Sequence, residues 1–188
     1  MFDTELTGIY RGKVLETDAN ESVKLGRVKL EIPPYLVGEE TANLMTQDID
    51  TRIDGMNVDD IPWAVPAQPL FFGAKDGQGS FSVPTVGSYV FAFFEGGNIF
   101  SPVYFANAID AGTSIPEEAE DNYPDTFVYK TPSGCSIVIN DNTGEVKITS
   151  ENDMKLIVGD NVEITSSGNV TVTGDTISIT GTQVNING

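Results

Sequence analysis

The chain contains no histidine, and its only cysteine is Cys135. Without histidine it cannot build the serine–histidine or cysteine–histidine pair of a nucleophilic hydrolase. A single cysteine excludes an intrachain disulfide, and we expect Cys135 to be a small buried thiol. No stretch approaches the roughly 20 apolar residues that span a bilayer, and residues 1–5 do not resemble a signal peptide. We therefore expect a soluble protein without a signal peptide.

Basic residues are also scarce, since 10 Lys and Arg stand against 28 Asp and Glu, for a net charge of −18. A protein that neutralises phosphates needs the opposite sign, so we expect no nucleic-acid partner. Paired carboxylates can hydrolyse glycosides, but they need a cleft between them. The cluster at Glu117, Glu118 and Asp121 lies in a segment with no predicted cleft, where acid favours solubility. We therefore predict a non-enzymatic protein with no catalytic residue, metal or cofactor.

Aromatic residues are confined to the first two thirds of the chain. The last aromatic residue is Tyr129 and the last leucine is Leu156, and beyond them the apolar residues are almost entirely Val and Ile. This change in composition predicts two regions that bury apolar surface differently. We place a barrel at 1–108, an acidic linker at 109–128 and a rod at 129–188.

The first region has the pattern of an all-β domain. Val28, Leu30 and Ile32 alternate with Lys29 and Glu31, which is typical of a half-buried strand. A short helix is predicted at 39–45, and the glycine-rich stretch 73–79 is predicted to be a flexible loop without the lysine of a phosphate-binding loop. Five strands in this length predict a small closed barrel, with the strands at 8–16, 28–32, 61–68, 89–94 and 102–108.

The last third repeats a short motif of two apolar residues separated by one residue. The last three of these pairs are spaced seven residues apart, and Gly174, Gly181 and Gly188 keep the same spacing. One short strand followed by one tight turn, repeated, indicates a β rod. Residues 140–144, Asn-Asp-Asn-Thr-Gly, are predicted to be a hairpin turn, which we prefer to a metal site at 141–145.

This rod cannot be stable as one chain. Residues 161–188 hold eight β-branched apolar residues and no aromatic residue, too few to offset the entropy of ordering the segment. A monomeric solenoid needs a longer repeat, and a disordered tail is poor in such residues. We therefore predict self-association about a common axis. The predicted core residues are Val162, Ile164, Val170, Val172, Ile177, Ile179, Val184 and Ile186.

Several short motifs, taken in order, resemble one family. They are Gly-Arg-Val at 26–28 with Ile-Pro at 32–33, Ile-Pro-Trp-Ala at 61–64, Val-Pro-Thr-Val-Gly at 83–87, Phe-Phe-Glu-Gly-Gly at 93–97 and Tyr-Lys-Thr-Pro-Ser-Gly at 129–134. In this order and spacing the chain resembles the central baseplate spike of contractile-tailed phages and related contractile injection systems. The resemblance covers nearly the whole chain.

The resemblance implies an all-β fold, with an N-terminal five-stranded OB-type barrel followed by a C-terminal intertwined trimeric β-helix. It also implies a homotrimer in the virion tail baseplate, assembled in the host cytoplasm. The barrel would attach to tail-tube and baseplate hub proteins, and the rod would puncture the host envelope on contraction. The alternative is a trimeric glycan-binding adhesin with the β-helix as its stalk.

The sequence departs from some members of this family in two respects. No lysozyme domain separates barrel from rod, and the lack of histidine excludes a His-x-His iron site at the tip. Since Val184 and Ile186 would leave apolar side chains at a blunt end, we expect a separate tip protein there.

Overall fold

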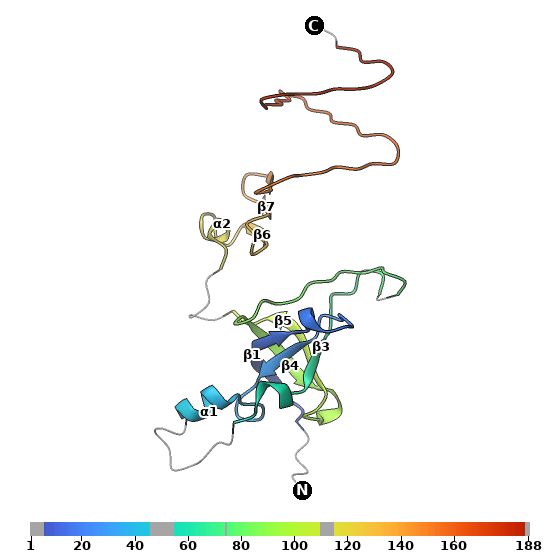
Figure 1. Ribbon diagram of the computed structural model, residues 1–188. Helices are drawn as coiled ribbons and strands as arrows, with labels where there is room; N and C mark the ends of the chain where they lie inside the picture. Colours follow the sequence, from blue (N-terminus) through green and yellow to red (C-terminus); the bar gives the residue numbers. More distant parts are fainter. Residues whose placement is uncertain (1–5, 46–54, 74, 110–114, 187–188) are drawn as a thin grey trace. The chain divides into compact units, whose positions relative to one another are not determined.

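The computed structural model of the chain describes residues 6–45, 55–73, 75–109 and 115–186. The chain divides into two compact units, the first ending at Glu120 and the second beginning at Asp121 (Figure 1). Each unit is a separate set of strands, so each is described by itself.

Five strands of the first unit close into a barrel in the order β1-β2-β3-β5-β4 (Figure 1). Every neighbouring pair is antiparallel except β3 and β5, which are parallel. A mixed five-stranded barrel in this order is OB-like. The all-β barrel predicted from the sequence is therefore confirmed. Its strands are β1 (Ile9–Thr17), β2 (Val28–Glu31), β3 (Trp63–Pro66), β4 (Tyr89–Phe94) and β5 (Pro102–Asn107).

The connections between these strands include short helices. The predicted helix at 39–45 is present as α1 (Glu39–Met45), and the 3-10 turns are η1 (Asp18–Asn20), η2 (Val58–Asp60) and η3 (Glu95–Gly97). Strand β3 is shorter than predicted because η2 and the turn after it occupy the residues before Trp63. Between β3 and β4, the described residues form no helix or strand.

The connection from β3 to β4 is fixed to the barrel at Gly26. This glycine has φ +73°, and a Cβ added there would lie 2.8 Å from the ring of Phe81. A side chain at position 26 would therefore be strained and would collide with the ring. Gly26 is required here because the Phe81 ring lies directly against its backbone.

The barrel core is formed by inward side chains of β1, β2, β3 and β4, with Tyr104 from β5 and four residues outside the strands, Leu6, Ile32, Leu36 and Ile61. Aliphatic side chains fill most of it, as expected for a small closed barrel. The fully buried hydrophobic side chains include Val14, Val28, Leu30, Ile32, Leu36, Ile61 and Val90.

Strand β2 differs from the half-buried strand predicted from its alternation. Lys29 and Glu31 are buried, with only 4% and 6% of their surface exposed. The Lys29 ammonium donates to the Val58 carbonyl at 2.7 Å, and a carboxylate oxygen of Glu31 accepts from the Gly38 N–H at 3.0 Å. The excursion between β2 and β3 therefore covers the outer side of β2. Sequence alternation could not show this, because a polar residue can be buried wherever a distant segment supplies its partner.

The second unit begins with a three-stranded antiparallel sheet of β6 (Thr126–Lys130), β7 (Ser136–Asn140) and β8 (Glu145–Thr149). The predicted hairpin turn is confirmed between β7 and β8, where the Gly144 N–H donates to the Asn140 carbonyl at 2.8 Å and Gly144 has φ +72°. Strand β6 begins within the segment predicted as linker, and the one-turn helix α2 (Glu117–Glu120) also lies there.

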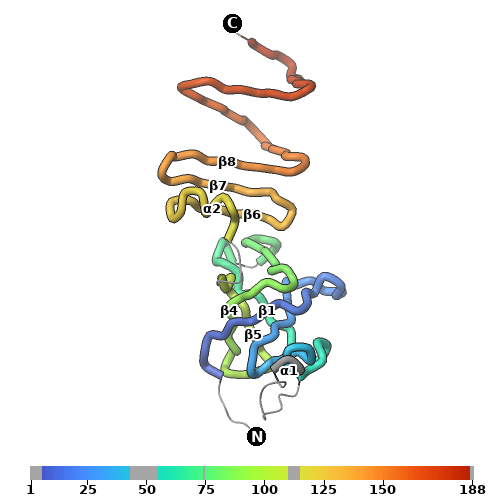
Figure 2. Tube along the Cα trace, turned by 90° about the vertical axis from the view of Figure 1, so that its left-hand side faces the viewer, coloured from blue at the N-terminus to red at the C-terminus, as the bar shows by residue number. Residues whose placement is uncertain are grey.

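Beyond β8 the single chain forms no β-helix. The described residues from 150 to 186 contain no helix and no strand. Figure 2 shows the chain crossing back and forth in extended runs after the stacked runs of β6, β7 and β8. The intertwined rod remains a prediction about an assembly of several copies.

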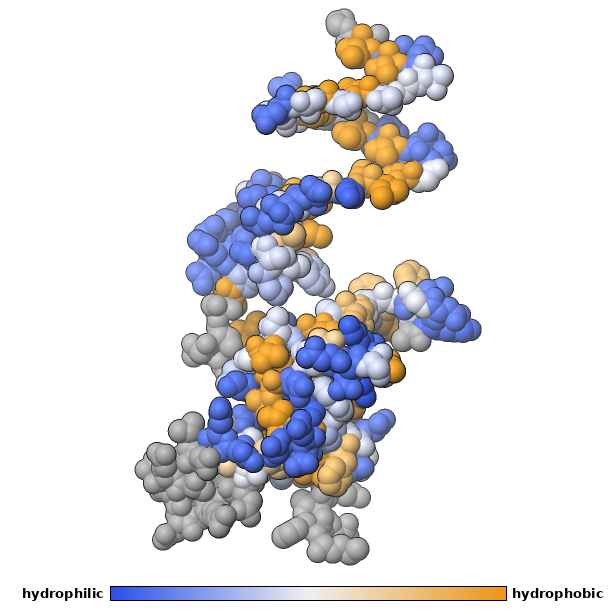
Figure 3. Space-filling view, viewed as in Figure 1, coloured by the Kyte–Doolittle hydropathy of each residue, from blue (hydrophilic) through white to orange (hydrophobic). Residues whose placement is uncertain are grey.

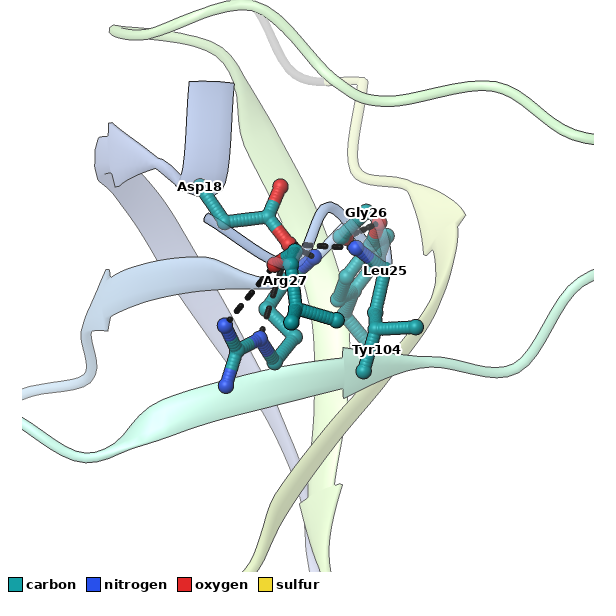
Figure 4. Close-up of polar contacts among 6 residues, drawn as sticks. Asp18, Leu25, Gly26, Arg27 and Tyr104 are labelled. Atoms are coloured by element: carbon teal, nitrogen blue, oxygen red, sulfur yellow. Dashed lines mark hydrogen bonds and ion pairs between the residues drawn. The ribbon is translucent and has the colours of Figure 1, made fainter. Parts of the chain in front are cut away.

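One buried carboxylate holds the connection between β1 and β2 closed (Figure 4). An oxygen of Asp18 accepts from the backbone N–H groups of Leu25 at 2.7 Å and Arg27 at 3.1 Å, and the Arg27 guanidinium lies 3.5 Å away. Beside it, the Tyr104 hydroxyl on β5 donates to the Gly26 carbonyl at 2.5 Å. These bonds attach the connection both to itself and to the barrel wall.

The pKa values of Asp18 and Tyr104 shift in opposite directions. Burial by itself would raise the pKa of Asp18, but the N–H groups of Leu25 and Arg27 and the Arg27 guanidinium favour the carboxylate, and the net pKa is lowered. Burial, with a smaller effect of the Asp18 charge, raises the pKa of Tyr104 to about 12. Asp18 is therefore an acceptor and Tyr104 a donor throughout the neutral range.

We predict that Asp18→Ala destabilises the protein by about 1–3 kcal/mol at pH 7, because two partly buried N–H groups lose their acceptor. A carboxyl group with a lowered folded pKa contributes stability above its unfolded pKa of about 3.9 and loses it as pH falls through the folded value. The difference from wild type should therefore shrink in acid. Urea unfolding between pH 2 and 7 measures this, with the exposed Glu21→Ala as control. A constant difference down to pH 2 would contradict the assigned role.

Candidate association interface

The sheet of the second unit carries six of its apolar side chains on one face, while Val128 and Val138 lie on the other. Phe127 pairs with Ile139 and Ile139 with Val146, while Tyr129 pairs with Ile137 and Ile137 with Ile148. Since alternate residues of a strand share a face, these six side chains lie together. All six are exposed, the least exposed being Ile139 at 39%. We call them the sheet face.

The arrangement is the reverse of that expected for a self-sufficient sheet. The buried residues of β7 are polar, Ser136 and Asn140, whereas the apolar Ile137 and Ile139 are exposed. A three-stranded sheet gains stability by burying its apolar face against another layer. Within the described part of this chain the sheet face has no such layer.

The eight predicted core residues continue this pattern along the C-terminal segment. Their exposure ranges from 46% at Val184 to 82% at Ile186. Hydrophobic side chains lie on the surface of this segment in Figure 3. Single exposed apolar residues are ordinary, but a continuous series of them marks a surface that associates. The single chain therefore neither buries these eight residues nor brings them into one cluster.

The backbone of this segment lacks strand partners as well. Among the described residues from 150 to 186, no backbone-to-backbone hydrogen bond is found. Extended backbone without a neighbouring strand offers a row of free donors and acceptors, which is the feature that makes an edge strand associate. Other copies of the chain could satisfy the apolar side chains and the backbone groups at the same time.

The side of the barrel on which OB folds commonly bind ligands is occupied by the chain's own cations. Trp63 on β3 has the Arg27 guanidinium 5.4 Å and the Lys29 ammonium 5.0 Å from its ring centre. Lys29 is also held by Glu16 at 3.6 Å and by Asp59 at 3.9 Å. A ligand base or sugar would have to displace these cations before it could stack on the ring. The sequence did not reveal this stack, because its members come from distant segments.

Cys135 is half-buried, whereas the sequence led us to expect a buried thiol. Hydrogen bonds from the Glu151 backbone and from the hydroxyls of Ser150 and Ser133 lower the pKa of its thiol.

Among the described residues no group of three or more acidic, cysteine or histidine side chains could hold a metal ion. In the same part of the chain no helix is both long and apolar enough to cross a membrane.

The fold and the exposed faces define an OB-like barrel joined to a β segment with an uncovered apolar side. No protein-family model matches this sequence, and no curated protein sequence matches it. The candidate interface therefore rests on the geometry of the chain itself.

We predict that Val172→Asp prevents self-association, because it would place one carboxylate from each copy within the buried axis of the assembly. Thr171→Asp, on the opposite side of the extended backbone, should be tolerated because its side chain would face water. Light scattering of both variants at micromolar concentration measures the outcome. Equal loss of the oligomer in the two variants would show that the face assignment is wrong.

Proposed function

We propose that this protein is the central spike of a contractile tail. In this function three copies associate through the sheet face and the C-terminal segment to form an intertwined rod. The barrel attaches to the tail tube and baseplate hub, and the rod punctures the host envelope when the sheath contracts. The observation that carries the proposal is the exposed apolar series from β6 to Ile186, which the chain cannot bury alone.

The two units have the properties that such a device needs. The barrel has a complete core of its own, so it can keep its shape while bound to other proteins. The described residues of the C-terminal segment form no helix or strand in the single chain. Only in the assembly would its backbone gain hydrogen-bond partners and its apolar side chains be buried from water along a common axis. An intertwined rod of this kind resists unfolding under load, because no chain can separate without breaking bonds to both neighbours.

The segments that resemble baseplate spikes lie at structurally important positions. Gly26 is the first residue of the Gly-Arg-Val run. Its carbonyl accepts a hydrogen bond from the Tyr104 hydroxyl, and its backbone lies against the Phe81 ring. The Ile-Pro-Trp-Ala segment leads into β3, and Tyr129 of the last motif lies on β6 in the sheet face. These positions support the proposal.

Three copies are favoured over two by geometry. Each chain presents one apolar face of alternating side chains, and three such faces can enclose a filled triangular axis in which each strand edge meets a neighbour. Two faces would form a flat sandwich whose outer edges stay open to further copies. A closed threefold arrangement leaves no open edge along the rod.

We expect the purified protein to have three times the mass of one chain by light scattering and to appear in electron micrographs as a head with a narrow projecting rod. Antibodies against it should label the tail end of contractile particles from the producing cells. A monomer at micromolar concentration would refute the assembly. A trimer that binds a glycan array but labels no tail would favour the adhesin.

We also expect no lytic activity, since the proposed puncture is mechanical. Incubation of the trimer with purified peptidoglycan should release no more soluble sugar than buffer, with a lysozyme sample as positive control. Digestion above the buffer level that is lost on heat denaturation would overturn the non-enzymatic function.

A further inference from the structure

The connection between β3 and β4 extends away from the barrel as an arm, which we define as residues 67–73 and 75–88 (Figure 1). Near its tip three successive apolar side chains lie in solvent, since Leu70 is 90%, Phe71 55% and Phe72 90% exposed. A run of large apolar residues on the surface of a folded domain marks a site of association. The tip of the arm therefore has the composition of a contact surface.

The arm has a defined shape, because hydrogen bonds join its two limbs. The Gln68 side-chain amide donates to the Ser82 carbonyl at 2.8 Å, and the Ser80 hydroxyl donates to the Pro69 carbonyl at 3.2 Å. Phe72 has φ +59°, a left-handed conformation that a bulky residue rarely adopts. Backbone strain of this kind is found where a segment is held ready to bind. The exposed tip is therefore a built feature of the connection.

An open groove with a volume of about 500 Å³ lies between the base of this arm and the connection from β1 to β2. Apolar surface predominates in its lining, and Phe81 and Val86 remain 65% and 61% exposed. An aromatic side chain removes about 150–250 Å² of surface from water when it is buried. Aromatic anchors in apolar pockets supply most of the binding energy of many protein interfaces. We call this groove the barrel-end groove, and its apolar residues are Ala19, Gly26, Phe81, Val83, Pro84 and Val86.

The tip of the arm cannot enter the groove of its own chain. The bonds from Gln68 to Ser82 and from Ser80 to Pro69 join the limbs between the tip and the base. The three apolar side chains of the tip lie beyond these bonds, whereas the groove residues 83–86 lie at the base. Folding the tip back would break both bonds. The groove can therefore accept a tip only from another copy.

The arm and the groove lie at the end of the barrel from which the chain continues to the second unit. Where the arm begins, the Ala67 N–H donates to the Tyr104 carbonyl on β5 at 2.8 Å. Just after β5, the Ala108 N–H donates to the carbonyl of Tyr89, the first residue after the arm, at 2.9 Å. Association of the second units would therefore raise the effective concentration of one copy's arm near another copy's groove.

We propose that the arm tip of one copy inserts into the barrel-end groove of the next copy. Leu70, Phe71 and Phe72 are buried there against the apolar lining of the groove. Because tip and groove are different surfaces, the contact is heterologous and repeats around a ring. The contact rests on the proposed trimer, in which the rod closes the ring at three copies. It joins the barrels to one another, separately from the rod.

Cysteine pairs test this contact in the full protein, with Cys135→Ser as the background. Chains with Phe72→Cys are refolded together with chains with Ala19→Cys and oxidised, and mass spectrometry measures the disulfide between positions 72 and 19. Its yield should be at least about threefold above that obtained when Phe100→Cys replaces Phe72→Cys. Phe100 is 70% exposed and lies between β4 and β5, at the opposite end of the barrel.

The oligomeric state separates failure of this contact from failure of the spike proposal. A trimer with no more of this disulfide than the Phe100→Cys control overturns the contact and leaves the spike standing. A monomer by light scattering refutes the spike and the contact together.

Matched variants test whether the apolar tip drives the contact. Adding Leu70→Asn to the Phe72→Cys chains should lower the disulfide yield about threefold or more, because an amide would be buried without a partner. Phe100→Asn, which also replaces an exposed apolar side chain with an amide, should leave the yield unchanged. An equal fall in the two variants contradicts the contact. Flotation of the trimer with phosphatidylcholine vesicles that Leu70→Asn abolishes, without the disulfide, would assign the tip to a membrane instead.

Discussion

An extended chain whose β-branched side chains and backbone groups have no partner cannot hold a fixed path in water by itself. From residue 150 to Ile186 the described part of this protein consists largely of such chain, with Val and Ile side chains exposed and no backbone-to-backbone hydrogen bond. The hydrophobic effect and the need to pair backbone donors act together here, and other copies of the segment can satisfy both. The proposed rod, its threefold closure and its mechanical role all depend on this constraint.

The barrel differs from the C-terminal segment, since it must be stable before another protein binds it. Its core is closed by strand pairing on every side, and its buried polar groups have partners either within the same connection or in a more distant segment. Asp18 with the N–H groups of Leu25 and Arg27, and Lys29 with the Val58 carbonyl, are such pairs. They stabilise the connections and attach the excursion between β2 and β3 to the barrel.

The sheet face and the barrel differ in what they need from other copies of the chain. The sheet face lies on a thin layer that lacks half of its core, so covering it is a matter of stability. The barrel has a core of its own, so it does not depend on another copy to bury its core side chains.

Local patterns in the sequence determined much of the architecture. The apolar run at 89–94 corresponds to β4, Glu39–Met45 is helical, and Asn140–Gly144 is a hairpin turn, since each depends on neighbours along the chain. The Val and Ile pairs indicated a segment without a sufficient core of its own. Only the tertiary structure decided which polar residues are buried, that Arg27 and Lys29 cover Trp63, and that Arg11 meets a phenylalanine cluster built from β4 and β5. The physical reason is that these contacts join residues distant in sequence, whose meeting depends on strand order and barrel closure, and periodicity within one strand carries no information about either.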